Sequence, residues 1–226
     1  MKRTAIVLGA KSDIYKALKS SFIADDWQMV EWTRYTPGVA RFPVWDLMLV
    51  MVGKISPVGM WHELDDYQWD HCMESNLLLP LRLLRKLWPK RNAGAQVCWF
   101  AGSNPNTIMT GYSAYNVSKM AVLKLVEQLD YEEPKHKFFA IGPGTVLTKI
   151  HEQTGAWPNP KLAQARAENK QMDVQRTYDC IKWCLEQPKE VIGGRNICVS
   201  DPWGGTGLQE ELSFRPTLLK LRREDL

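Results

Sequence analysis

The sequence of 226 residues predicts an α/β fold: a doubly wound, mostly parallel sheet between two layers of helices. Three observations lead to this prediction. Short apolar runs alternate with segments of helical periodicity along the chain. A glycine turn at Gly9 joins the first apolar run to the first helical segment. Glycine or polar residues follow the apolar runs, as expected at the carboxyl edge of a sheet, where ligands bind.

The first predicted strand covers residues 4–8, and the first predicted helix covers Asp13–Ala24. A strand, a tight glycine turn and a helix open a dinucleotide-binding unit, where phosphates meet backbone N–H groups at the positive end of the helix. The usual second and third glycines are replaced by Asp13 and Tyr15, and an ordinary β-turn-α connection also explains the pattern. The turn residues that would surround the phosphates are Gly9, Lys11, Ser12, Asp13 and Ile14.

The second predicted strand, Trp27–Trp32, bears on the choice of cofactor. A dinucleotide lying across the sheet brings its adenosine ribose to the end of this strand, where an acid binds a 2′-hydroxyl and a base accommodates a 2′-phosphate. Arg34 and Lys11 are basic, and no acid follows the strand. The sequence therefore favours NADP, with NAD as the alternative; the competing interpretation is that both side chains are solvated surface cations.

The third βα unit is predicted to be shortened. Residues 37–43 are loop-like, and a buried strand over 45–53 follows without a crossover helix, whereas parallel strands normally need a dozen or more connecting residues. Residues 151–172 are predicted to be irregular and polar. The other predicted elements are a helix pair or one long helix over 64–88, a strand over 95–100, a helix over 114–129, a strand over 137–141, a helix over 174–186 and a strand over 196–200.

Composition and charge exclude several classes of protein. The net charge of +4 comes from interspersed acids and bases, which does not indicate a nucleic-acid partner. No apolar run approaches the ~20 residues of a membrane span, and no secretory signal is recognised, so we expect a cytoplasmic protein without a membrane partner. The five cysteines are odd in number, lie in apolar surroundings and lack metal-ligand spacing, so we expect reduced thiols and no metal site.

Tyr115 and Lys119 stand four residues apart in the predicted helix 114–129, so their side chains share one face. A cation beside a phenol favours the ionised form and lowers the phenol pKa from about 10. A tyrosine tuned in this way can give a proton to a carbonyl oxygen or take one from an alcohol. The spacing alone is common by chance and also fits an ordinary surface pair.

Taken together, these residues resemble the short-chain dehydrogenase/reductase family over nearly the whole chain. Residues 115–119, Tyr-Asn-Val-Ser-Lys, resemble the family's Tyr-x-x-Ser-Lys active-site helix. Residues 143–148, Pro-Gly-Thr-Val-Leu-Thr, resemble its Pro-Gly-x-x-x-Thr loop, which binds the nicotinamide end of the cofactor. The predicted helix around Asn76 is similar to the one that carries the active-site asparagine, and residues 9–14 are similar to the variant cofactor loop Gly-Ala-Ser-Ser-Asp-Ile-Gly.

The resemblance implies a Rossmann-type domain over 1–226, with 151–172 as the substrate-loop region and 202–226 as a C-terminal tail. It implies hydride transfer between NADP(H) and the carbonyl or alcohol of a small polar substrate, and a homodimer or homotetramer formed through the helices 77–87 and 115–129. The substrate itself and the direction of the reaction are not predicted.

The resemblance also implies individual roles. Tyr115 would be the acid/base, Lys119 would hold the nicotinamide ribose, and Asn76 would anchor a water that relays protons to Lys119. Ser103 would hydrogen-bond the substrate oxygen if its loop is one residue shorter than in the family, with Ser113 as the fallback. The cofactor-binding residues would be Gly9, Lys11, Ser12, Asp13, Ile14, Arg34, Gly53, Tyr115, Lys119, Pro143, Gly144, Val146 and Thr148.

Departures from the family pattern leave other hypotheses open. Tyr15 replaces the third glycine, so its side chain must point away or shift the helix, and residues 50–53, Val-Met-Val-Gly, replace Asn-Asn-Ala-Gly. These departures and the trimmed third unit favour a binding or regulatory protein that kept the fold and lost turnover. A third hypothesis is a nucleotide-sugar reductase or epimerase, although such relatives usually carry a larger substrate domain.

Overall fold

The structure is a computed structural model that describes residues 2–33, 38, 41–102, 108–155, 157, 159–168 and 172–222. Its centre is a six-stranded sheet with the order β2-β1-β3-β4-β5-β6, in which every pairing is parallel. The strands are β1 (Arg3–Leu8), β2 (Trp27–Trp32), β3 (Trp45–Val50), β4 (Arg91–Phe100), β5 (Lys137–Gly142) and β6 (Asn196–Cys198).

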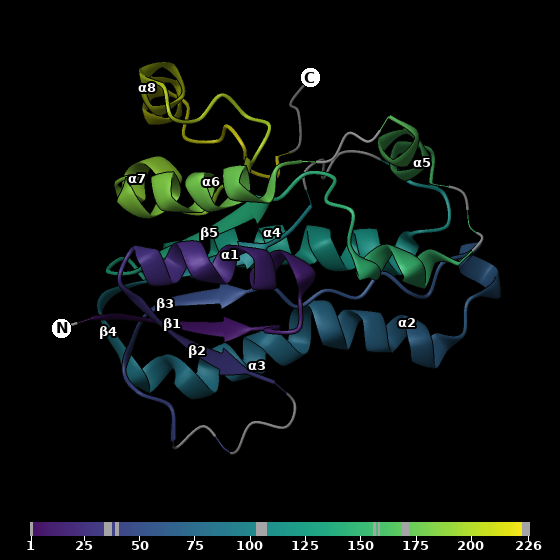
Figure 1. Cartoon of the computed structure of the whole chain (residues 1–226), viewed down its shortest axis with the longest axis horizontal. Coiled ribbons are helices and arrows are strands. Elements are labelled where there is room, and N and C mark those ends of the chain that lie inside the picture. Colours follow the sequence, from purple (N-terminus) through teal and green to yellow (C-terminus); the bar gives the residue numbers. More distant parts are fainter. Residues whose placement is uncertain are drawn as a thin grey trace.

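Helices cover both faces of the sheet, so the domain has three layers (Figure 1). The helices are α1 (Asp13–Ala24), α2 (Asp66–Met73), α3 (Leu79–Leu87), α4 (Ser113–Glu132), α5 (Pro160–Ala167), α6 (Val174–Glu186), α7 (Lys189–Ile192) and α8 (Thr206–Phe214). One core contains α1, α6, α7 and α8, and the other contains α3 and α4.

The strands are buried on both faces because alternate side chains enter different cores. Ala5 and Val7 pack with Phe22 of α1 on one face of β1. Ile6 and Leu8 pack on the other face, in the core that contains α3 and α4. Near-continuous apolar runs therefore form these strands, which confirms the predicted doubly wound parallel sheet.

The shortened third unit is visible in the sheet order. β2 ends at Trp32 and β3 begins at Trp45 on the far side of β1, and no α-helix is found among the described residues between them. Met51, which follows β3, donates its backbone N–H to the carbonyl of Leu8 at 2.8 Å. This bond continues the β1–β3 pairing up to the edge where β1 enters its glycine turn.

Several predicted boundaries need correction. The region 151–172 is not irregular throughout, because it contains the end of a 3₁₀ helix, η5 (Lys149–Thr154), and all of α5. The Asn159 side chain caps α5 by accepting the backbone N–H of Leu162 at 3.0 Å. Of the two alternatives predicted over 64–88, the helix pair is observed: α2 and α3 are joined by a π-helical turn, η3 (Glu74–Leu78). The strand predicted over 45–53 ends at Val50.

Candidate active site

A cavity of about 830 Å³ opens at the carboxyl edge of the sheet. Its walls come from the turn after β1, the segment after β3, the end of β4, helix α4 and the loop after β5. This edge is where parallel α/β sheets bind ligands. The predicted site residues that line the cavity are Gly9, Lys11, Ser12, Asp13, Ile14, Gly53, Tyr115, Lys119, Pro143, Gly144, Val146 and Thr148.

Gly9 turns the chain out of β1 beneath this cavity. Its φ is +100°, and a Cβ at this position would lie 2.8 Å from the backbone carbon of Met51 and the backbone nitrogen of Val52. Only glycine fits there, because both the backbone angle and the space exclude a side chain. The chain then enters α1 at Asp13, and Ser12 provides no side-chain cap, so the first turn of α1 faces the cavity as an anion-binding end.

Tyr15, which replaces the family's third glycine, points away from the cavity. The side chain is 1% exposed and packs in the core with α6, and its hydroxyl donates a 2.9 Å hydrogen bond to Glu31 of β2. Lys19 forms an ion pair with the same carboxylate at 2.7 Å. The Tyr15 side chain is part of the core between α1 and the sheet, so its ring does not occupy the space beside the glycine turn.

Tyr115 and Lys119 share the face of α4 that lines the cavity, as their spacing predicts. Lys119 is 8% exposed, and its ammonium group donates to the carbonyl of Phe100 at 2.8 Å. The same nitrogen lies 5.9 Å from the centroid of the Tyr115 ring. The carbonyl at the end of β4 thus holds the lysine ammonium group near the Tyr115 ring.

The prediction that Lys119 lowers the pKa of Tyr115 is wrong. Burial raises the pKa of the Tyr115 phenol to about 12, and burial lowers the pKa of the Lys119 ammonium to about 8. Desolvation is the main cause of both shifts, because the walls that enclose the two groups disfavour their charged forms. At neutral pH the phenol therefore keeps its proton, which is the form that can donate to a carbonyl oxygen.

Asn76 is fully buried in η3 and does not line the cavity. Its side chain exchanges two hydrogen bonds with the backbone of Lys54, accepting the N–H at 2.7 Å and donating to the carbonyl at 2.9 Å. It also donates to the hydroxyl of Ser118 at 2.8 Å, which in turn donates to the carbonyl of Tyr115 at 2.7 Å. Asn76 therefore ties the segment after β3 to the helix that carries Tyr115.

Of the remaining predicted residues, the structure describes Ser113. Ser103 and Arg34 lie outside the described residues. Ser113 lines a different hollow of about 640 Å³ on another face of α4, together with Asn116 and Val117. The fallback prediction for Ser113 is therefore not supported, because its position two residues before Tyr115 turns it to another side of the helix.

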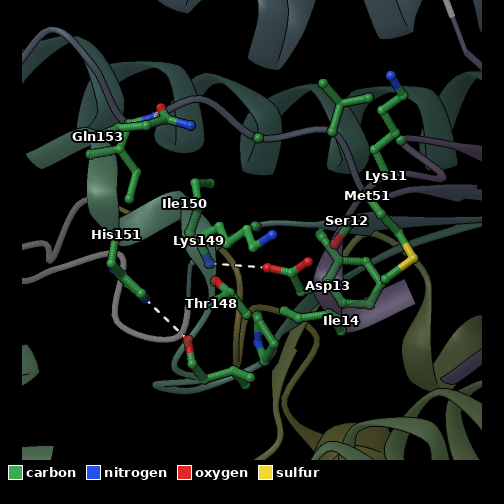
Figure 2. A pocket seen from close by; sticks show the side chains of 18 of the residues that line it. Lys11, Ser12, Asp13, Ile14, Met51, Thr148, Lys149, Ile150, His151 and Gln153 are labelled. Atoms are coloured by element: carbon green, nitrogen blue, oxygen red, sulfur yellow. Dashed lines mark hydrogen bonds between the residues drawn. The ribbon is translucent and has the colours of Figure 1, made fainter. Parts of the chain in front are cut away.

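Residues of η5 complete the cavity and were not predicted as cofactor or catalytic residues. Figure 2 shows Lys149 beside Asp13 of the glycine turn, although the two residues are far apart in sequence, with His151 and Gln153 farther from the turn. The carboxylate of Asp13 accepts the backbone N–H of Lys149 at 3.0 Å (Figure 2). Adjacency to the Thr148 motif was the only available sign, since an isolated 3₁₀ turn has no strong periodicity.

The η5 segment is also anchored at its other end. The side-chain oxygen of Gln153 accepts the backbone N–H of Ile55 at 3.0 Å. Beyond η5, the indole of Trp157 donates to the carbonyl of Thr110 at 2.9 Å. The segment is thus fastened to the loop after β3 and to the approach to α4.

The described lining of the cavity carries four lysines and one carboxylate. The lysines are Lys11, Lys16, Lys119 and Lys149, and the carboxylate is Asp13. The hydrogen bond from Lys149 N–H, followed by the charge of Lys16, holds the pKa of Asp13 below its usual range. The cavity therefore has a positive surplus at neutral pH, which suits an anionic ligand.

Among the described residues, no group of three His, Cys, Asp or Glu side chains could hold a metal ion. All five cysteines are buried, and none of them forms a disulfide. None of the helices within the described ranges has the length and apolar character needed to cross a bilayer.

Comparison with known proteins adds a family and several structural relatives. A short chain dehydrogenase family model matches residues 38–159. Short chain dehydrogenase adrF of Penicillium roqueforti is 23% identical over 175 residues, which cover 70% of this chain and 68% of the relative. The short-chain dehydrogenase/reductase YIR035C of Saccharomyces cerevisiae has a TM-score of 0.75 at 17% identity, covering 88% of this chain and 97% of that chain. A small-chain dehydrogenase in complex with NADPH has a TM-score of 0.76 at 14% identity, covering 88% and 96%.

Proposed function

This chain belongs to the short-chain dehydrogenase family of nicotinamide-dependent oxidoreductases, and we propose that it transfers hydride between NADP(H) and the carbonyl or alcohol of a small polar substrate. The observation that carries the proposal is the meeting of Tyr115 and Lys119 with the glycine turn of Gly9 in one cavity. Neither the Tyr115/Lys119 pair nor the glycine turn alone indicates a dinucleotide-dependent enzyme, because each pattern is common in proteins that bind no dinucleotide.

The residues present fit a dinucleotide. The cavity volume of about 830 Å³ lies within the range of small-molecule sites. Gly9 leaves room for close backbone approach, and the lysine surplus suits the phosphates. The turn 9–14 would hold the diphosphate, Thr148 the carboxamide, and Lys119 the nicotinamide ribose. Bound nicotinamide would supply the hydride.

The remaining chemistry falls to the chain's own side chains. In the direction of reduction, the protonated phenol of Tyr115 donates its proton to the substrate oxygen as that oxygen gains negative charge. Lys119, held by the carbonyl of Phe100, places a cation beside the group that has lost the proton. Asn76 braces α4 through Ser118, and we propose it as the anchor of a water that relays protons to Lys119.

The preference for NADP over NAD is also a proposal. It is supported by Lys11 in the lining of the cavity, by the basic Arg34 after β2, and by the NADPH bound to one structural relative. A cytoplasmic location and a homodimer or homotetramer through α3 and α4 are proposed on family resemblance.

A panel of carbonyl compounds tests the reaction itself. Purified protein, NADPH and each aldehyde or ketone would be followed by NADPH absorbance, with NADH in a parallel series. We expect substrate-dependent loss of NADPH with a few polar carbonyls and slower loss with NADH. If neither cofactor is oxidised with any compound although both bind, the chain is a binding protein on the same fold and the proposal fails.

A further inference from the structure

Lys149 opens η5, directly after the motif that ends at Thr148. The residue lines the cavity, and Figure 2 shows its side chain extending toward Asp13 at the glycine turn. Its backbone N–H donates a 3.0 Å hydrogen bond to the Asp13 carboxylate. Within the described part of the chain, no ion pair forms with its ammonium group.

Asp13 fixes where Lys149 lies. This carboxylate sits at the first position of α1, where one oxygen accepts the Lys149 N–H and the other lies 3.5 Å from the Lys16 ammonium. The two segments are 136 residues apart in sequence, and this bond joins the start of η5 directly to the phosphate-binding turn. It engages the backbone of Lys149 and not its ammonium group.

The charges at this end of the cavity are unbalanced. Lys11, Lys16 and Lys149 line it, whereas Asp13 is the one carboxylate among the described lining residues and is already engaged twice. An ammonium group beside a helix N-terminus offers a phosphate both a full charge and oriented N–H groups. A diphosphate carries two negative charges, which the lysines and the backbone N–H groups of this turn would bind.

On the basis of the proposed function, we propose that Lys149 binds the diphosphate of the dinucleotide and that Asp13 is the positioning residue that holds it at the glycine turn. The diphosphate would thus be contacted from two sides, by a cation on η5 and by backbone N–H groups at the start of α1. The substrate loop would contribute to cofactor affinity through this residue.

The test measures dissociation constants for NADPH and for ADP-ribose, which has the diphosphate but neither nicotinamide nor 2′-phosphate. Lys149→Met should weaken both about tenfold, the effect of losing one charge-assisted contact. Lys149→Arg should bind within about threefold of wild type, because it keeps the cation. Lys135→Met removes an exposed lysine just before β5, at the opposite edge of the sheet, and should change neither constant.

Asp13 has its own pair of variants. Asp13→Asn keeps an acceptor for the Lys149 N–H and removes a negative charge, so NADPH should bind at least as tightly as in wild type. Asp13→Ala removes the acceptor and should bind NADPH more weakly, although loss of charge alone would predict tighter binding. Tighter binding by Asp13→Ala would remove the positioning role.

Each result for Lys149 decides the inference. If Lys149→Met weakens NADPH but not ADP-ribose, the lysine meets the 2′-phosphate and the diphosphate assignment is wrong. If it weakens neither, Lys149 has no role in cofactor binding, while binding by the wild type would leave the proposed function intact. If the wild type binds neither ligand, the proposed function and this inference both fail.

Discussion

The ammonium group of Lys119 donates a 2.8 Å hydrogen bond to the carbonyl oxygen of Phe100, the last residue of β4. The lysine that family resemblance pairs with Tyr115 is thus held by the end of a central strand. Its nitrogen stays 5.9 Å from the centroid of the tyrosine ring. Since desolvation then governs both groups, the phenol is protonated and ready to act as an acid in reduction.

Replacement of Tyr115 by phenylalanine removes the proposed proton donor and leaves the ring that lines the cavity. We expect the rate of carbonyl reduction to fall by about 10²–10⁴, the usual contribution of a general acid. The dissociation constant for NADPH should stay within a few-fold of wild type, as measured by fluorescence titration. Undiminished turnover in Tyr115→Phe would take this residue out of the mechanism.

The lowered pKa of Lys119 predicts that the stability of the folded chain depends on pH. Burial lowers its pKa from 10.5 to about 8, so between these values the unfolded chain keeps a proton that the folded chain has released. The free energy of unfolding should therefore rise with pH across this window by the contribution of Lys119, and that contribution is missing below about pH 8.

Urea unfolding of wild type and Lys119→Met at several pH values between 7 and about 10 measures this contribution. The difference in unfolding free energy between wild type and variant should shift in favour of wild type as pH rises. A constant difference across the range would show that the folded Lys119 keeps an ordinary pKa.

Asn76→Ala should be strongly destabilising. The change leaves the backbone N–H of Lys54 without its acceptor and the Lys54 carbonyl with only the Cys72 thiol as donor, in a partly buried setting, and the free energy of unfolding should fall by about 2–4 kcal/mol. Asn92→Ala is the matched control, because this asparagine makes one side-chain hydrogen bond, to Asp46, and should cost about 1 kcal/mol or less. Equal losses in urea unfolding would mean that Asn76 does not brace the core.

Gly9→Ala should damage both the fold and the cofactor site. Its Cβ would lie 2.8 Å from the backbone of Met51 and Val52, in addition to the strain of φ +100°. Gly94→Ala carries a similar backbone strain, with φ +73°, but its Cβ meets no atom within 4 Å. We expect Gly9→Ala to cost about 1–3 kcal/mol more than Gly94→Ala in thermal or urea unfolding. Losses of the same size would show that the contact with the β3 side is unimportant.

Periodicity and turn residues were sufficient for most of the fold. They predict α1, β2 and α6 at their observed bounds, because each is a simple run followed by a polar residue: Asp25, Thr33 and Gln187. They miss α5, whose start depends on the side-chain cap of Asn159. A single capping hydrogen bond leaves no periodic pattern in the sequence.

The site was predictable to the extent that it consists of motifs. Tyr115, Lys119 and Thr148 are found in the cavity where the motifs place them. The pKa of Tyr115, the outward direction of Tyr15 and the partners of Asn76 depend on burial and on contacts between distant segments, so no local pattern contains them. The same holds for the bond between Asp13 and Lys149.

The proposal that this chain binds a nicotinamide dinucleotide is tested by titrating the purified chain with NADPH and with NADH, followed by quenching of tryptophan fluorescence. We expect saturable binding of NADPH at the cavity around Gly9 and Lys119, with weaker binding of NADH. Absence of saturable binding for both dinucleotides would contradict it.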